Sequence, residues 1–378
     1  MLKTPIQMVD VLGQYERFQS RIDAAVIATI RSGAMVGGPA VEAFRTAMSK
    51  YLDTKHVIPC GNGTDALQIA LMALGLQRGD EVIVPAFTYV ATAEVIGLLG
   101  LTPVMIDVEP NTFNINAALV EAAITPRTKA IIPVHLFGQS TDMEAILQLA
   151  EREGIYVVED NAQAIGAEYR FTDGTVRKTG TIGHIGCTSF YPSKNLGAYG
   201  DGGALFTNDD ALAETLRSTA NHGQSCRRYY HERLGVNSRL DSIQAAILTI
   251  KLAHLDEFNA ARNAAAGWYD EAFADMDEVQ IPHRHERSTH VFHQYTLRVS
   301  NGKRDALKAH LNSMGIPSMI YYPVPLYRQE AYRGFWDGTP LPHTEALSHE
   351  VLSLPMHSEL TLEICNLVSS AVQSFFRD

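Results

Sequence analysis

The chain has 378 residues, of which 46% are hydrophobic and 19% are charged, a length and composition that suit a globular protein of two domains. Its formal net charge of −11 repels a phosphate backbone, so we expect no nucleic-acid partner. Its apolar runs end within roughly ten residues, too few to span a bilayer, so no membrane association is expected.

The first predicted element is a helix at about residues 9–32, and an alternation of two kinds of segment begins near residue 56. Short apolar runs typical of strands occupy 56–60, 81–85, 103–108, 129–136 and 155–160. Helix-like stretches occupy 64–74, 91–100, 116–124 and 142–153. This alternation predicts βαβ units, and the near-continuous apolar strands indicate a mainly parallel sheet covered by helices on both faces.

The pattern changes after about residue 240. The later elements are a long helix or kinked pair of helices at 242–273, a strand at 293–300, a helix at 303–315, an extended segment at 317–327 and a helix at 360–376. We therefore predict an α/β fold with a large domain of residues 1–250 and a smaller α+β domain of residues 251–378. The first helix is expected to pack beside the smaller domain or a neighbouring subunit.

A candidate anion site is the segment GNGTDAL (61–67), which follows a predicted strand and opens a predicted helix. Glycines let backbone amides approach a ligand, and a helix N-terminus favours a negative charge. The alternative is an ordinary helix cap at Thr64 or Asp65.

A candidate acid is Asp160, which ends a predicted buried strand in VVEDNAQAIGA (157–167). Ligands of open α/β sheets collect at the carboxyl ends of the strands, where a carboxylate can hold a proton on a pyridine nitrogen. The alternative is that Asp160 or Asn161 caps a following helix.

A candidate reactive amine is Lys194, in the sparsely charged segment GCTSFYPSKNLGAYGDGGALFTND (186–209). Desolvation lowers the pKa of an ammonium group, and the uncharged amine is the form that condenses with a carbonyl. Ser189 lies five residues earlier and has a hydroxyl for a phosphate, and the glycines that follow indicate a tightly turned backbone. The alternative is a solvated surface lysine.

Together these segments resemble the DegT/DnrJ/EryC1/StrS family of sugar-nucleotide aminotransferases, from about Ile6 to the terminal helix. Supporting stretches are PAFTYVATAE (85–94), DVEPNTFNI (107–115), HLFGQSTDM (135–143), NHGQ (221–224), GVNSRLDSIQAAIL (235–248) and YYPVPL (321–326). The resemblance implies pyridoxal phosphate (PLP) as cofactor and PLP fold type I, the aspartate aminotransferase-like architecture.

The resemblance also implies roles for single residues. Lys194 would form the Schiff base with PLP and move the proton during amino transfer, and Asp160 would pair with the ring nitrogen. Gln163 would contact the ring hydroxyl, and Tyr89 would stack on the ring face, although core packing alone would also account for Tyr89. The phosphate cup would consist of Gly63, Thr64 and Ser189.

The loop GVNSRLD (235–241) implies a homodimer with shared active sites, because Asn237 looks like a phosphate ligand donated by the second subunit. Arg239 would meet the sugar nucleotide or a carboxylate, and a salt bridge to Asp241 or a neighbour is the alternative. The reaction would be ping-pong: glutamate would leave as 2-oxoglutarate, and the keto sugar would take the amine.

The resemblance is closest to enzymes for 3-oxo sugar nucleotides, including UDP-2-acetamido-2-deoxy-3-oxo-glucuronate, whose products serve glycan biosynthesis. One departure is Tyr321, where many 3-aminotransferases carry His, since Tyr cannot offer positive charge to a uronate. Arg239, His290 and His293 are alternative sources of that charge. A dTDP-3-oxo-6-deoxyhexose is the second candidate substrate and a 4-oxo sugar the third.

Other classes fit less well. A dinucleotide oxidoreductase would need the G-x-G-x-x-G turn that is missing here, and the related sugar dehydratases carry His where this chain has Lys194. A regulatory relative without activity is disfavoured, because every cofactor position has a competent residue type. No metal is expected at the histidine-dense stretch 283–293, because its arginines disfavour a cation.

The four cysteines are scattered and form no C-x-x-C pair, which suits a reducing cytoplasm: Cys60, Cys187, Cys226 and Cys365. Residues 1–10 lack the basic stretch and apolar run of a signal peptide. We therefore expect a cytoplasmic protein.

Overall fold

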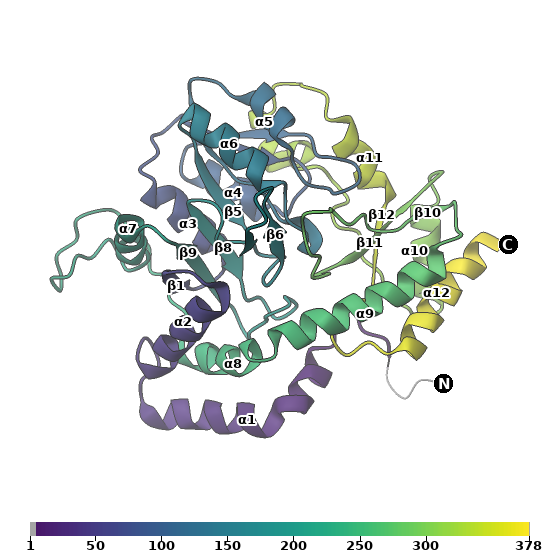
Figure 1. The fold of residues 1–378 in the computed structure, drawn as a ribbon, viewed down its shortest axis with the longest axis horizontal. Helices are drawn as coiled ribbons and strands as arrows, with labels where there is room; N and C mark the ends of the chain where they lie inside the picture. The colour runs from purple at the N-terminus through teal and green to yellow at the C-terminus, as the bar shows by residue number, and fades with distance from the viewer. Residues whose placement is uncertain (1–4, 378) are drawn as a thin grey trace.

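A computed structural model describes residues 5–377 and has at its centre a seven-stranded sheet of order β1-β9-β8-β5-β4-β2-β3 (Figure 1). The strands are β1 (His56–Cys60), β2 (Glu81–Pro85), β3 (Thr102–Ile106), β4 (Thr128–Ile131), β5 (Tyr156–Asp160), β8 (Ile185–Ser189) and β9 (Gly203–Thr207). Neighbouring strands from β3 to β8 pair in parallel, and β9 runs antiparallel to both β1 and β8. The predicted α/β fold with a mainly parallel sheet is confirmed.

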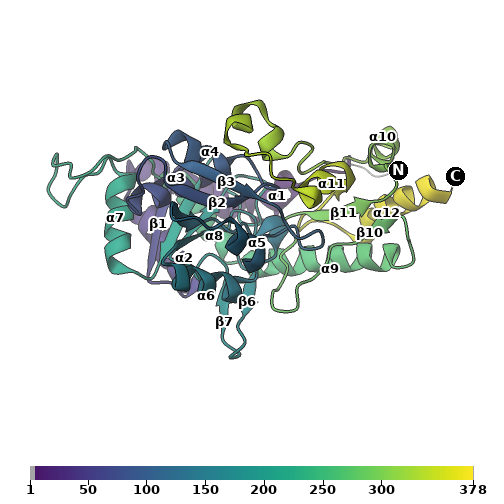
Figure 2. The same ribbon diagram turned by 90° about the horizontal axis from the view of Figure 1, so that it is seen from above.

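Helices cover both faces of this sheet (Figure 2). They are α2 (Pro39–Leu52), α3 (Gly63–Ala73), α4 (Ala91–Leu98), α5 (Ala117–Ala123), α6 (Met143–Glu153) and α7 (Asp210–Ala220). Alternate side chains of β2 pack on opposite faces of the sheet. Val82 and Val84 pack in the core beneath α3 and α4, while Ile83 packs in the core beneath α6. Burial on both sides explains why the strand sequences are almost continuously apolar.

The C-terminal part forms a small antiparallel sheet of order β10-β11-β12 beside three helices. Its elements are β10 (Val279–Gln280), β11 (Tyr295–Val299), β12 (Val351–Leu354), α9 (Leu255–Phe273), α10 (Arg304–Ser313) and α12 (Leu362–Arg377). The stretch 242–273 is a pair of helices, α8 (Ser242–Leu252) and α9, as one of the two predicted alternatives had it. The domain boundary near residue 250 stays a prediction.

Several elements escaped the sequence patterns. They include strands β8, β9 and β10 and helices α2 and α7. The others are the hairpin β6 (Glu168–Arg170) and β7 (Val176–Lys178), the helix α11 (Pro342–Glu350), and the 3-10 turns η1 (Leu136–Gly138), η2 (Leu326–Arg328) and η3 (Glu330–Phe335). The strand predicted at 129–136 is regular only over Thr128–Ile131, and an isolated bridge of Val134 to Asp160 follows before the chain turns through Phe137, whose φ is +58°.

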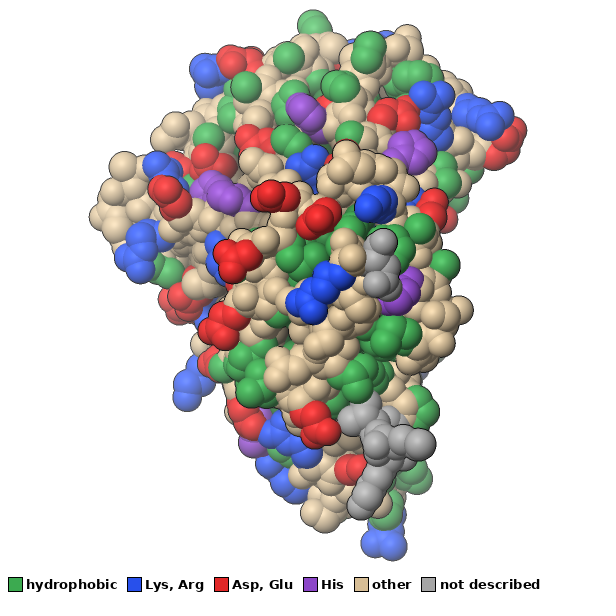
Figure 3. All heavy atoms as spheres, turned by 90° about the vertical axis from the view of Figure 1, so that its right-hand side faces the viewer, with side chains coloured by type: hydrophobic (Ala, Val, Ile, Leu, Met, Phe, Trp, Pro, Cys, Tyr) green, Lys and Arg blue, Asp and Glu red, His purple; other side chains and the backbone are tan. Residues whose placement is uncertain are grey.

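The first helix, α1 (Val11–Ser32), lies along α8 and reaches the C-terminal part (Figure 1). The Gln14 side chain donates to Ser358 Oγ (3.1 Å), and Arg17 pairs with Glu359 (2.9 Å). The end face of the molecule near α10 and α12 carries basic and acidic side chains interspersed with apolar ones (Figure 3). Within residues 5–377, no helix combines the length and apolar character needed to cross a bilayer.

Candidate active site

A cavity of about 800 Å³ lies where β5 and β8 reach their carboxyl ends. Eight of the residues singled out by the sequence line it: Gly63, Thr64, Tyr89, Asp160, Gln163, Ser189, Lys194 and Tyr321. Residues from five separate stretches of the chain therefore meet in one place.

One end of the cavity is built by the start of α3. The helix is capped by Asn62, whose Oδ1 accepts from the backbone N–H of Asp65 (2.8 Å), so neither Thr64 nor Asp65 is the cap. Gly63 approaches Ser189 so closely that an added Cβ would lie 2.7 Å from the Ser189 Cβ. The hydroxyls of Thr64 and Ser189 thus adjoin a helix N-terminus, an arrangement suited to an anion.

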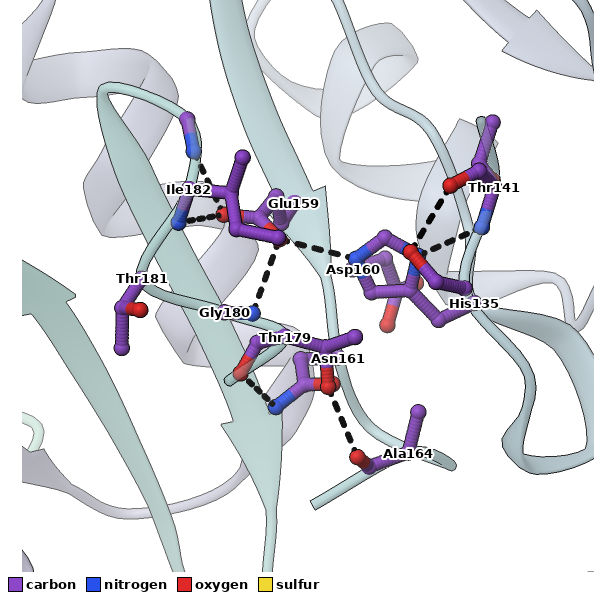
Figure 4. Close-up of polar contacts among 12 residues, drawn as sticks. His135, Thr141, Glu159, Asp160, Asn161, Ala164, Thr179, Gly180, Thr181 and Ile182 are labelled. Carbon is purple, nitrogen blue, oxygen red and sulfur yellow. Dashed lines mark hydrogen bonds and ion pairs between the residues drawn. The ribbon is translucent and has the colours of Figure 1, made fainter. Parts of the chain in front are cut away.

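Asp160 is the last residue of β5, and its carboxylate is buried in the cavity wall (Figure 4). Its Oδ2 accepts from the Thr92 hydroxyl (2.9 Å), and its Oδ1 accepts from the backbone N–H of Ala162 (3.1 Å). Burial raises the pKa of Asp160, and these hydrogen bonds and the Lys194 ammonium counteract the rise only in part. No helix follows Asp160, so the helix-cap alternative is wrong.

Lys194 is half-buried in a tight turn, and its backbone N–H donates to the Tyr191 carbonyl (2.8 Å). Burial lowers the pKa of Lys194 to about 8, and the Asp160 carboxylate opposes that shift. The turn depends on Gly197, where an added Cβ would lie 2.3 Å from the Pro192 carbonyl oxygen. The lysine is therefore not a solvated surface residue.

The far wall is aromatic. Tyr89 is exposed at the cavity, and its ring centroid lies 6.3 Å from that of Tyr322. Gln163 accepts from the backbone N–H of Phe137 (2.7 Å) and donates to the Tyr322 hydroxyl (3.1 Å). Sequence analysis missed Tyr322 and Thr92, and the only signal for Tyr322 was its place in the YYPVPL stretch.

Asn237 and Arg239 lie outside this cavity in the single chain. Both are exposed, and Arg239 borders a separate hollow of about 440 Å³ between α2 and α7. Within residues 5–377, no acidic side chain lies within salt-bridge distance of Arg239, and Asp241 instead caps α8 at the Gln244 N–H (2.9 Å). The structure therefore does not form the predicted alternative salt bridge to Asp241.

The histidine-dense stretch has no metal-binding geometry: the part of the chain that the structure describes holds no cluster of three His, Cys, Asp or Glu ligands. His290 stacks on Phe292 at 3.8 Å, and burial lowers its pKa to about 3. His293 does line the cavity, but burial holds its pKa well below the usual range. Burial therefore disfavours the charged form of both histidines, against the expectation that either supplies positive charge.

These residues fit PLP by their chemistry. The hydroxyls at the start of α3 suit its phosphate, and the exposed face of Tyr89 suits its ring. Asp160 is a buried carboxylate whose charge is incompletely compensated, and a protonated ring nitrogen would compensate it. Lys194 offers an amine whose pKa of about 8 leaves about half of it uncharged at pH 8.

Comparison with known proteins gives a match to the DegT/DnrJ/EryC1/StrS aminotransferase family over residues 16–373. The UDP-2-acetamido-2-deoxy-3-oxo-D-glucuronate aminotransferase of Pseudomonas aeruginosa is 44% identical over 367 residues, covering 97% of this chain and 99% of the relative. The dTDP-3-amino-3,4,6-trideoxy-alpha-D-glucose transaminase of Streptomyces venezuelae is 42% identical over 362 residues, 95% of this chain and 93% of the relative.

Among solved structures, S. venezuelae DesV in complex with a ketimine intermediate is 41% identical and aligns with a TM-score of 0.93. The alignment covers 99% of both chains. The likeness therefore extends over the sheet, the cavity and the C-terminal part together.

Proposed function

Since the chain belongs to the DegT/DnrJ/EryC1/StrS aminotransferase family, we propose that it aminates the 3-oxo carbon of a sugar nucleotide, with glutamate as amino donor. The chain is a PLP-dependent sugar-nucleotide aminotransferase.

Bound PLP supplies an electron-withdrawing ring and a carrier for the amino group between donor and acceptor. In our proposal, Lys194 holds the cofactor through its amine. During amino transfer it moves the proton between the two carbon atoms that flank the transferred nitrogen. Asp160 keeps the ring nitrogen protonated, and Tyr89 packs on the ring face. Thr64 and Ser189 bind the phosphate.

Gln163 has only part of its amide free for the ring hydroxyl. Its amide already donates to the Tyr322 hydroxyl, so contact with the ring hydroxyl would use its remaining N–H. Tyr322, which also lines the cavity, then helps to orient Gln163. Tyr321, beside it at the cavity, is proposed to contact the sugar.

We also propose a homodimer in which Asn237 and Arg239 enter the cavity of a second copy. This is supported by their exposure and by the fact that neither lines the cavity of its own chain. A shared site is the arrangement expected of a two-fold dimer whose interface borders the cavity.

The observation that carries the proposal is that Asp160 and Lys194 line one cavity beside a helix N-terminus. The test runs the reaction in reverse: 3-amino and 4-amino sugar nucleotides, as UDP and dTDP forms, are incubated with 2-oxoglutarate and scored for glutamate. We expect turnover with a 3-amino substrate and none from Lys194→Ala. Turnover of 4-amino sugars alone would contradict the 3-oxo assignment.

The second candidate is a dTDP-linked 3-oxo-6-deoxyhexose, which the likeness to the S. venezuelae transaminase supports. The same experiment separates the two, because it compares UDP and dTDP forms of otherwise matched sugars. Borohydride treatment of the PLP-loaded protein adds a check on the site: the label should lie on Lys194.

A further inference from the structure

A second buried acid stands directly before Asp160 on strand β5, and the proposed function gives it no task. Glu159 and its partner His135 are fully buried, and the His135 Nε2 lies 2.9 Å from the Glu159 Oε2 (Figure 4). Neither residue lines the cavity. Because successive side chains of a strand point to opposite faces, Glu159 points away from the side that Asp160 occupies.

Glu159 is ionised, because donors surround both of its oxygens. Its Oε1 accepts from the backbone N–H groups of Ile182 (2.7 Å) and Gly183 (2.6 Å). Its Oε2 accepts from the backbone N–H of Gly180 (2.8 Å) and from the His135 ring. Burial raises the pKa of Glu159, but the hydrogen bonds outweigh burial and hold it below its usual value.

The His135 ring is fixed in one tautomer. Its Nδ1 accepts from the backbone N–H of Thr141 (3.1 Å), so the ring proton sits on Nε2 and is donated to Glu159. The imidazole is thus held from both sides.

Backbone hydrogen bonds connect His135 to Asp160. The backbone N–H of His135 donates to the Asp160 carbonyl (3.1 Å), and the backbone N–H of Asp160 donates to the Pro133 carbonyl (2.9 Å). A closed ring of contacts therefore runs from the Glu159 side chain through the His135 ring and backbone to Asp160. The end of β5 cannot rotate without breaking it.

We propose that His135 and Glu159 are positioning residues for Asp160, holding its carboxylate in line with the ring nitrogen of the cofactor. This inference rests on the role that the proposed function gives to Asp160. A buried charged pair can also serve folding alone. The test must therefore measure a property of the bound cofactor as well as stability.

The test variant is His135→Phe, which keeps a ring but removes the Nε2 donor, and His135→Gln restores a donor. The measured quantities are the pH midpoint of the visible absorption band of PLP-loaded protein and the affinity for PLP. We expect His135→Phe to raise the midpoint by about one pH unit and to weaken PLP binding on the order of tenfold, the equivalent of one pKa unit. His135→Gln should recover at least half of the shift.

The direction follows from the charge on the ring. A ring nitrogen held less firmly as a cation withdraws less charge from the Lys194 nitrogen, which then keeps its proton to higher pH. The charged or titratable groups that act on Asp160 itself are Lys194 and His135. Only His135 changes in this variant, so the shift reports on the pair.

Thr296→Val is the matched control, because it breaks a buried hydrogen bond between Thr296 and Ser353 (2.8 Å) in the small sheet. It should lower stability and leave the midpoint unchanged. If His135→Phe, like the control, lowers only the stability and leaves the midpoint and the PLP affinity unchanged, the pair serves folding and our inference is overturned. If His135→Phe does not accumulate as folded protein, Glu159→Gln, which has the same size, is judged by the same criteria.

Asp160→Asn separates this inference from the proposed function. If Asp160→Asn leaves the midpoint unchanged, the proposed role of Asp160 fails and the inference fails with it. If Asp160→Asn shifts the midpoint but neither His135→Phe nor Glu159→Gln does, only the positioning role is lost.

Discussion

The hydrogen bond from Thr92 to Asp160 gives a sharp test of how the cavity carboxylate is stabilised. Thr92→Val removes the hydroxyl that donates to Asp160 Oδ2 at 2.9 Å and nearly preserves the side-chain volume. Thr92 is fully buried, and the added methyl group of valine would occupy the place of its hydroxyl, so no donor takes that position. A hydrogen bond to a charged group contributes about 1.5–3 kcal/mol, and we expect Thr92→Val to lower the free energy of unfolding by that amount near pH 8.

The loss of unfolding free energy in Thr92→Val should depend on pH in a defined direction. The folded-state pKa of Asp160 in the cofactor-free protein is raised above its unfolded value of about 3.9 by burial, so stability falls as pH rises through the interval between the two. The Thr92 bond lowers that folded-state pKa, and its removal widens the interval. The stability difference between wild type and Thr92→Val should therefore be larger at pH 8 than at pH 5.

The assay is urea unfolding of the cofactor-free protein at both pH values, with Thr188→Val as matched control. Thr188 is equally buried and donates to the uncharged Asn161 carbonyl (3.2 Å), so its loss should cost about 0.5–1.5 kcal/mol at either pH. Equal, pH-independent losses in the two variants would refute the argument that Asp160 is an ionised carboxylate stabilised by Thr92.

Three further predictions concern the cavity and its proposed partner. Because the pKa of Lys194 is about 8, its reaction rate with an acylating reagent in the cofactor-free protein should reach half its maximum near pH 8; a midpoint near 10.5 would contradict the burial argument. Gly63→Val should abolish retention of PLP through gel filtration while the far-UV circular dichroism stays native, because its Cβ would meet the Ser189 Cβ at 2.7 Å. Mixing inactive Lys194→Ala with inactive Asn237→Ala subunits should restore up to about a quarter of wild-type activity, since a two-fold dimer with shared sites then has one intact site in half of the molecules; no recovery in exchanged dimers would exclude a shared site.

Local pattern was enough to predict five of the seven strands of the sheet and four of the six helices that cover it, because strand burial on both faces leaves a nearly continuous apolar run. Strands β8 and β9 and helices α2 and α7 were not predicted. Local pattern also located Asp160 and Lys194, each of which ends or follows a strand beside residues of turn type. The limits of strand β4 and the hairpin β6–β7 escaped it. They depend on the irregular backbone between Ile131 and Phe137 and on a pairing of three residues, neither of which has a periodic signal.

Contacts between distant segments account for the functional residues that were missed. Thr92 lies 68 positions from Asp160, and Tyr322 lies 159 positions from Gln163. Each had an adequate local explanation, Thr92 as a helix residue and Tyr322 as part of an extended apolar stretch. Only the crossing of α4 over the end of β5 makes Thr92 a donor to the cavity carboxylate.

Two buried lysines show why a lowered pKa does not by itself mark the reactive amine. Lys251 on α8 is more completely buried than Lys194, and burial lowers its pKa to about 7, below that of Lys194. Its ammonium group donates to the Gly197 carbonyl and lies over the Tyr199 ring, and Lys251 lines neither of the two hollows described above. Lys194 instead faces a space large enough for a cofactor, with the Asp160 carboxylate in the same wall. Access and an opposing acid, rather than desolvation alone, therefore distinguish the amine that can condense with a carbonyl from the one that anchors the turn behind it.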